Sequence, residues 1–166
     1  MASGDLLATL NPLSNTPPSA NFATFDTRNS HAILDFDDTT SESCVFGNLV
    51  MPSNYAGGGL TIVLGIAMTS ATTNAVVFSA AMELVGNSSQ DIDSDGFATA
   101  VNSASITVNG TTGNVFDVTI TLTSGAQMDS VTAGDRFRLK IARLPADAGD
   151  TAAGDAELWS ARVREA

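Results

Sequence analysis

The sequence predicts an all-β fold, an antiparallel β-sandwich of the jelly-roll type with about eight strands. Three observations support this prediction. Short runs of residues alternate between apolar and polar side chains, which is the pattern of strands with one buried face. Turn-forming residues separate these runs. Thr, Ser, Ala, Gly and Val are abundant, and only 15% of the 166 residues are charged, which suits one domain with a substantial core.

Residues 1–21 are expected to form an extended N-terminal arm, and residues 22–166 the jelly-roll domain. The arm contains Pro12, Pro17 and Pro18 among several Ser and Thr residues, a composition that favours extended backbone. Apolar side chains on such an arm would serve to anchor it to a partner, since a free monomer has no use for exposing them. The expected anchors are Leu6, Leu7, Leu10 and Leu13.

Two strands are expected after the arm, over residues 31–37 and 43–51. The first alternates, with Leu34 and Phe36 facing the core. The second is mostly apolar and ends at Pro52, because proline cannot donate to a sheet ladder.

The next four strands are expected over residues 60–68, 76–84, 105–108 and 115–122. The first two of these each carry a continuous apolar face, so they are predicted core strands, and we expect them to pair as antiparallel neighbours. The other two flank the turn sequence 109–113, which predicts a hairpin.

The last two strands are expected over residues 136–144 and 157–165, where apolar and polar side chains again alternate. No segment is predicted to form a helix of three turns. The side chains expected in the core are Leu34, Phe36, Leu60, Ile62, Leu64, Ile66, Phe78, Met82, Phe116, Val118, Ile120, Leu122, Phe137, Leu139, Ile141 and Trp159.

Charge and hydropathy exclude two classes of partner. Eighteen acidic residues outnumber seven basic ones, and the net charge is −11. Such a chain is repelled by nucleic acid and by anionic lipid. The longest apolar stretch, 60–68, is much shorter than the roughly 20 residues of a membrane helix, and no secretory signal is recognisable at the N-terminus.

One acidic segment matches the first half of a calcium-binding loop. Asp91, Asp93 and Asp95 stand at alternate positions before Gly96, which permits a sharp turn. Asn102 occupies the position of the closing glutamate, so an EF-hand is excluded. Calcium binding and a solvated acidic turn both stay open, and no other cofactor is expected. A second acidic cluster raises the same question and comprises Asp35, Asp37, Asp38 and Glu42.

No catalytic constellation stands out, so the chain is not expected to be an enzyme. The single histidine, His31, begins a strand without any link to Ser43 or to the single cysteine, Cys44. Only Trp159 and Tyr55 could stack on a sugar, and Trp159 alternates with the core face. A carbohydrate-binding module or a minor enzyme stays a further alternative.

Basic side chains gather on the last two predicted strands. Arg136, Arg138 and Lys140 take successive outward positions on one, and Arg162 and Arg164 alternate outward on the other. They either pair with acidic neighbours of the same chain or meet acidic loops of a sister subunit.

Five segments resemble a group of tailed-bacteriophage virion proteins with β-sandwich folds. The segments are FDTRN (25–29), LDFDD (34–38), MPSNYAGGGL (51–60), QDIDSD (90–95) and GDAEL (154–158). Within that group, an acidic jelly roll with an extended arm is similar to capsid decoration, or cement, proteins.

That resemblance implies a function, partners and a location. The chain would bind the outer surface of the phage head and stabilise it. Its partners would be the major capsid protein and itself, as a homotrimer, on a virion assembled after synthesis in the host cytoplasm. The alternative is a tail-fibre or receptor-binding module of the virion.

Overall fold

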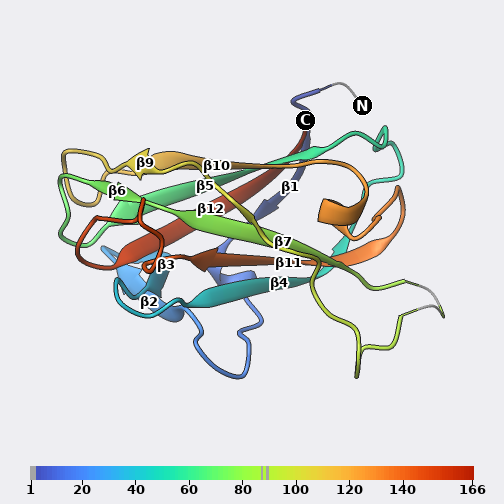
Figure 1. Ribbon diagram of the computed structural model, residues 1–166, viewed down its shortest axis with the longest axis horizontal. Coiled ribbons are helices and arrows are strands. Elements are labelled where there is room, and N and C mark those ends of the chain that lie inside the picture. The colour runs from blue at the N-terminus through green and yellow to red at the C-terminus, as the bar shows by residue number, and fades with distance from the viewer. Residues whose placement is uncertain (1–2, 87, 89) are drawn as a thin grey trace.

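The computed structural model describes residues 3–86, 88 and 90–166, which form two facing antiparallel sheets (Figure 1). Sheet A contains, in order, β10 (Phe116–Leu122), β5 (Leu60–Met68), β12 (Ala156–Glu165), β3 (His31–Phe36) and β2 (Thr24–Arg28). Sheet B contains β4 (Ser43–Val50), β11 (Arg136–Arg143), β7 (Phe78–Leu84) and β8 (Val101–Asn102). The predicted all-β jelly-roll sandwich is confirmed.

The remaining elements are short. β6 (Ala75–Val76) and β9 (Ile106–Thr107) pair as a separate two-stranded ribbon. The helical segments among the described residues are the 3₁₀ turns η1 (Pro12–Ser14) and η2 (Ala126–Met128). In the part of the chain that the structure describes, no helix is long and apolar enough to span a membrane.

The core lies between the two sheets and contains all but two of the side chains predicted for it. The exceptions are Phe116, which is partly buried, and Trp159, which is 48% exposed. Phe36 of sheet A meets Phe78 of sheet B edge to face, with 5.5 Å between the ring centroids. The inner faces of the two sheets therefore pack against each other, and, with these two exceptions, the side chains that the alternation predicted for the core lie between them.

Two predicted strand pairings are wrong. β5 pairs with β10 and β12, whereas β7 pairs with β11 and β8, so the two strands lie in opposite sheets. The expected hairpin also does not form, because β9 pairs with β6 instead of β10. Backbone hydrogen bonds to residues distant in sequence hold the two ends of this segment apart from a hairpin pairing. Val108 N donates to Asn74 O at 3.0 Å, and Gly113 N donates to Met68 O at 3.1 Å.

The segment expected as an extended arm contains a strand. β1 (Leu6–Leu10) pairs antiparallel with β12, and Leu10 lies opposite Ala161. Farther along, Thr16 N donates to Val45 O at 2.7 Å, which holds the chain beside β4. The sequence of β1 has no regular alternation of polarity, so the pattern did not predict a strand there.

Arg143, at the end of β11, is the largest fully buried side chain among the described residues. Its guanidinium pairs with both oxygens of the Asp150 carboxylate, with Nε–Oδ2 3.2 Å and Nη2–Oδ1 3.0 Å. It also donates to the carbonyls of Gly154 and Ala152 at 2.8 Å each, and to that of Phe36 at 3.4 Å. A buried charge is tolerated when its donors are satisfied in this way.

Replacing Arg143 with Met should destabilise the fold strongly, because Asp150 would remain as a buried carboxylate without its cation. We expect a loss of about 3 to 5 kcal/mol in the free energy of unfolding, measured by urea denaturation. Arg136→Met is the matched control, since Arg136 is exposed on the same strand and its change should cost within about 0.5 kcal/mol. Similar small losses in both variants would contradict this role for Arg143.

Candidate functional site

Two hollows on the outer face of sheet A meet at Trp159 and Val115, which line both of them. Hollow 1 has a volume of about 500 Å³ and extends from Trp159 to Arg28. Hollow 2 has a volume of about 540 Å³ and extends from Trp159 to Leu13. We call the two hollows together the groove.

Trp159 reaches the groove because β12 contains a β-bulge. Leu158 lies opposite Ile66 on β5, and Ser160 lies opposite Gly65, so Trp159 is an extra residue in the ladder. The bulge shifts the alternation of β12 by one position, and Leu158 stays buried while Trp159 points outward. The prediction of Trp159 as a core residue is wrong for this reason.

The floor of hollow 2 is open because Gly65 has no side chain. A Cβ at this position would lie 3.2 Å from both Ser160 Oγ and Val115 Cγ1. Across the same strand, Arg162 of β12 donates to both carboxylate oxygens of Asp117 of β10, at 2.8 Å each. One wall of hollow 2 is thus an ion pair that crosses β5, in which Arg162 Nη2 contacts both oxygens of Asp117.

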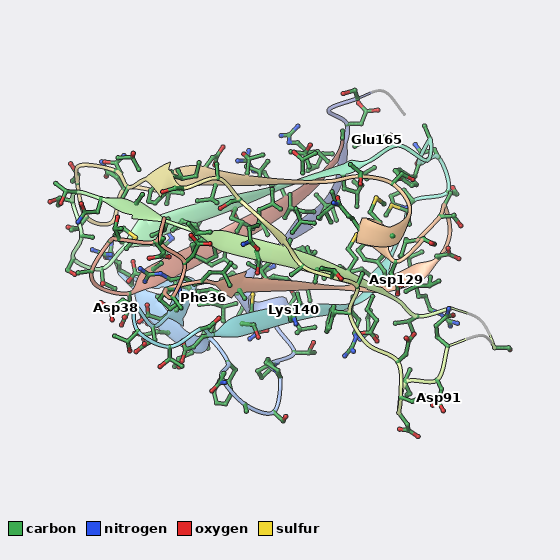
Figure 2. The ribbon with its side chains drawn as sticks, viewed as in Figure 1. Phe36, Asp38, Asp91, Asp129, Lys140 and Glu165 are labelled. Carbon is green, nitrogen blue, oxygen red and sulfur yellow. The ribbon has the colours of Figure 1, made fainter. Side chains whose placement is uncertain are left out.

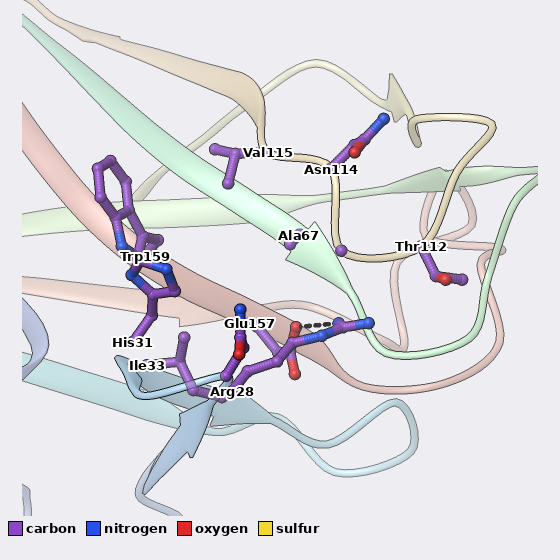
Figure 3. A pocket seen from close by; sticks show the side chains of 11 residues that line it. Arg28, His31, Ile33, Ala67, Thr112, Asn114, Val115, Glu157 and Trp159 are labelled. Atoms are coloured by element: carbon purple, nitrogen blue, oxygen red, sulfur yellow. Dashed lines mark hydrogen bonds and ion pairs between the residues drawn. The ribbon is translucent and has the colours of Figure 1, made fainter.

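Arg28 and Glu157 form the polar wall of hollow 1 (Figure 3). Arg28 Nη1 lies 2.5 Å from Glu157 Oε2 and also donates to Met68 O at 3.0 Å. The guanidinium rests against Gly113, where φ is +78° and a Cβ would lie 3.1 Å from Arg28 Nη2. Glycine at position 113 therefore leaves room for Arg28 as well as for the turn.

Figure 3 shows how the other polar groups of hollow 1 are placed. His31 and Trp159 lie at one end, and Thr112 and Asn114 lie at the other. A hollow with an indole at one end and hydroxyl, amide and ion-paired groups along the rest of its lining suits a ligand that is polar at its rim and apolar on one face.

Asp35 is a partly buried carboxyl beside the groove, directly opposite Glu157 in the pairing of β3 with β12. Its Oδ1 is buried and has no hydrogen-bond partner among the described residues. Burial raises the pKa of Asp35 to about 6, and the negative charges of Asp155, Glu157, Asp26 and Glu42 add to the increase.

The residues of the predicted calcium loop do not line the groove. Figure 2 shows Asp91 on a projecting loop and Asp38 at the opposite end of the molecule. Asp91, Asp93 and Asp95 are all exposed, and Asp91 Oδ1 accepts a hydrogen bond from Asp93 N at 3.0 Å. Calcium binding by these residues stays a prediction.

Part of the second acidic cluster does converge in the structure. Within residues 3–86, 88 and 90–166, one group of three carboxylates has ligand oxygens within 4.8 Å of one another, and it comprises Asp37, Asp38 and Asp155. These carboxylates already accept backbone hydrogen bonds: Asp37 Oδ1 accepts from Thr39 N at 2.7 Å, and Asp155 Oδ1 accepts from Asp38 N at 3.2 Å. They stabilise the loops beside them.

The basic side chains of β11 have partners within the chain. Arg138 forms an ion pair with Glu83, and Arg138 and Lys140 both lie over the ring of Phe97, at 5.0 and 4.9 Å from its centroid. Arg136 Nε donates to the Val85 carbonyl at 3.4 Å.

The basic side chains of β12 are also engaged. Arg162 pairs with Asp117 in hollow 2, and Arg164 Nη1 donates to Gly4 O at 2.9 Å. The structure thus agrees with the alternative in which the cations of the last two strands are bound within their own chain.

The leucines predicted as arm anchors have different environments. Leu10 is buried and Leu7 is partly buried against the core, whereas Leu6 is half exposed and Leu13 is 75% exposed. Leu10 and Leu13 both line hollow 2. Two of the expected anchors therefore belong to the groove.

No family model matches the sequence, and no curated protein matches it. Solved structures with similar folds include the C-terminal CBM6 of LamC, a marine laminarinase of Zobellia galactanivorans, with a TM-score of 0.54 and 13% identity over 95% of this chain and 98% of that chain. Another is the CBM22-1 xylan-binding domain of Paenibacillus barcinonensis Xyn10C, with a TM-score of 0.51 and 11% identity over 99% and 97%.

A third is Clostridium thermocellum Xyn10B, solved as CBM22-1 and GH10 modules complexed with xylohexaose. Its TM-score is 0.52 with 9% identity, and the match covers all of this chain but 29% of that one. At these identities the likeness shows a fold in common with non-catalytic carbohydrate-binding modules.

These likenesses correct the predicted identity. The resemblance to phage capsid decoration proteins is wrong, and so are the virion function, the tail-fibre alternative, and the major capsid protein and homotrimer as partners, because the structures that share the fold are carbohydrate-binding modules. The motifs behind the resemblance are short and rich in Asp and Gly, which reflects turn chemistry that unrelated β-sandwiches share. The virion location stays a prediction.

Replacing Asp35 with Asn should change how stability depends on pH. The pKa of Asp35 is about 6 in the folded protein and 3.8 in its reference state, so the folded state holds the proton more tightly. Its contribution to stability is complete below pH 3.8 and is lost as the pH rises through 6. We expect Asp35→Asn to be more stable than wild type at pH 8 and to lose this decline, as measured by urea denaturation between pH 4 and pH 8.

Asp93→Asn is the control for this variant, because it makes the same change in net charge on an exposed turn. If wild type and Asp35→Asn show parallel stability profiles across the pH range, Asp35 does not titrate as described.

Proposed function

We propose that this chain is a non-catalytic module that binds a carbohydrate in the groove over sheet A. The observation that carries the proposal is the half-exposed indole of Trp159, which a β-bulge places at the junction of two hollows. A tryptophan that could have been buried by regular alternation is instead presented to solvent where a ligand has room to lie against it.

The chemistry around Trp159 suits a sugar. A pyranose ring has an apolar face of C–H groups, which packs on a flat aromatic surface, and a rim of hydroxyls that donate and accept hydrogen bonds. Asp117 and Arg162 lie in hollow 2, and Arg28 and Glu157 in hollow 1. Each ion pair fixes its charged groups in place, so that they can bind hydroxyls without first being ordered.

The comparisons support the proposal through fold alone. Domains described as CBM6 and as a xylan-binding CBM22 share the sandwich architecture. Fold likeness does not assign a ligand, so the argument for a sugar depends on the groove and not on the likeness.

Trp159→Ala should weaken carbohydrate binding by about tenfold or more, because truncating a central aromatic anchor removes the stacking surface. Binding is measured as retardation in native gels that contain soluble polysaccharides: laminarin, arabinoxylan, hydroxyethylcellulose, galactomannan, alginate, polygalacturonate and carboxymethylcellulose.

Phe25→Ala is the matched control. Phe25 is an aromatic residue with 50% exposure that lies on β2 outside both hollows. Its replacement should leave retardation unchanged, with thermal melting used to check that all variants are folded. The proposal fails if no polysaccharide retards the wild type, or if Trp159→Ala binds as well as Phe25→Ala. As a non-catalytic module, the wild type should also release no reducing ends from any of these polymers.

A further inference from the structure

The charged side chains that line the groove cancel one another. Hollow 1 contains Arg28 and Glu157, and hollow 2 contains Arg162 and Asp117. Each cation is bound to the anion of its own hollow, at 2.5 and 2.8 Å. Recognition of a carboxylate or sulfate is favoured by a cation whose charge is not already balanced, and both guanidiniums in the groove already have a carboxylate partner.

The surroundings of the groove are acidic. The chain has a net charge of −11, Asp35 of β3 lies opposite Glu157, and Asp26 of β2 is close enough to Asp35 to act on its carboxyl. An anionic polymer approaching this face would be repelled by the protein as a whole. A ligand without charge experiences no such penalty.

The two hollows have different walls but share one platform. Leu10, Pro12 and Leu13 give hollow 2 an apolar wall, whereas His31 and Asn114 give hollow 1 polar groups. Trp159 stands between them with Val115. A ligand that stacks centrally on the indole therefore has space to continue on both sides of it.

We infer that the groove takes a stretch of an uncharged polysaccharide that crosses Trp159 and occupies both hollows. This inference rests on the proposed function, since it specifies the ligand of the same site.

Ligand charge is tested by comparing the uncharged polymers of the gel panel with the anionic ones, which are alginate, polygalacturonate and carboxymethylcellulose. Each gel is run at low salt and at about 0.15 M salt, because the higher salt screens interactions between surface charges beyond roughly 8 Å. Retardation of the wild type by at least one uncharged polymer, to the same degree at both salt concentrations, is expected. Retardation by anionic polymers alone would overturn the inference and leave carbohydrate binding standing. Retardation by none would overturn the proposed function itself.

Occupancy of both hollows is tested with one variant in each. Leu13→Ala removes the exposed apolar wall of hollow 2, and Asn114→Ala removes an amide from hollow 1. Each should weaken binding to the best uncharged polymer of the panel by about fivefold. Ile92→Ala is the control, because Ile92 is 77% exposed, as Leu13 is 75% exposed, and lies outside the groove. If binding depends on Trp159 but is unchanged in either hollow variant, the ligand fills one hollow and the inference is wrong.

Discussion

The buried ion pair of Arg143 and Asp150 connects the two sheets and thereby fixes the strand on which the groove depends. Removing a guanidinium from water costs several kcal/mol, and here the cost is offset by hydrogen bonds to the Asp150 carboxylate and to the carbonyls of Phe36, Ala152 and Gly154. Asp150 Oδ2 also accepts from Val77 N at 3.0 Å, next to β7. The same few atoms therefore hold the end of β11, the start of β7 and the segment that leads into β12.

β12 is the strand that the rest of sheet A is built around, because it pairs with β5 on one side and with both β3 and β1 on the other. Its first residues, up to Leu158, lie beside β3, and its later residues, from Ala161, lie beside β1. The bulge at Trp159 falls between these two stretches, where the neighbour changes. The same break in pairing thus turns the indole outward and leaves a hollow on each side of it.

Local periodicity predicted the fold class and most of the core, because alternation within a strand is a property of consecutive residues. It could not predict which strands pair, since β5 and β7 have equally apolar inner faces and only contacts distant in sequence place them in opposite sheets. Nor could it predict that Trp159 faces outward, because the residue inserted at a β-bulge cannot be recognised from the pattern of polarity. By type, Trp159 and Tyr55 are the side chains able to stack on a sugar, although the alternation of β12 predicts Trp159 in the core. The bulge separates their roles, because Tyr55 is buried with its hydroxyl bound to the Gly58 carbonyl while Trp159 is presented to solvent.

The distribution of charge follows from how few cations the chain has. All seven Lys and Arg side chains contact partners within the chain: carboxylates for Arg28, Arg138, Arg143 and Arg162, backbone carbonyls for Arg136 and Arg164, and the Phe97 ring for Lys140. The other acidic side chains have no basic partner among these ion pairs, and apart from Glu165 they are at least partly exposed. Against that background the groove is a region in which charges are balanced pair by pair, beside the exposed apolar side chains of Trp159 and Val115. Under the proposed function, such a surface would disfavour an anionic polysaccharide by repulsion outside the groove, in addition to the contacts that the groove makes with an uncharged one.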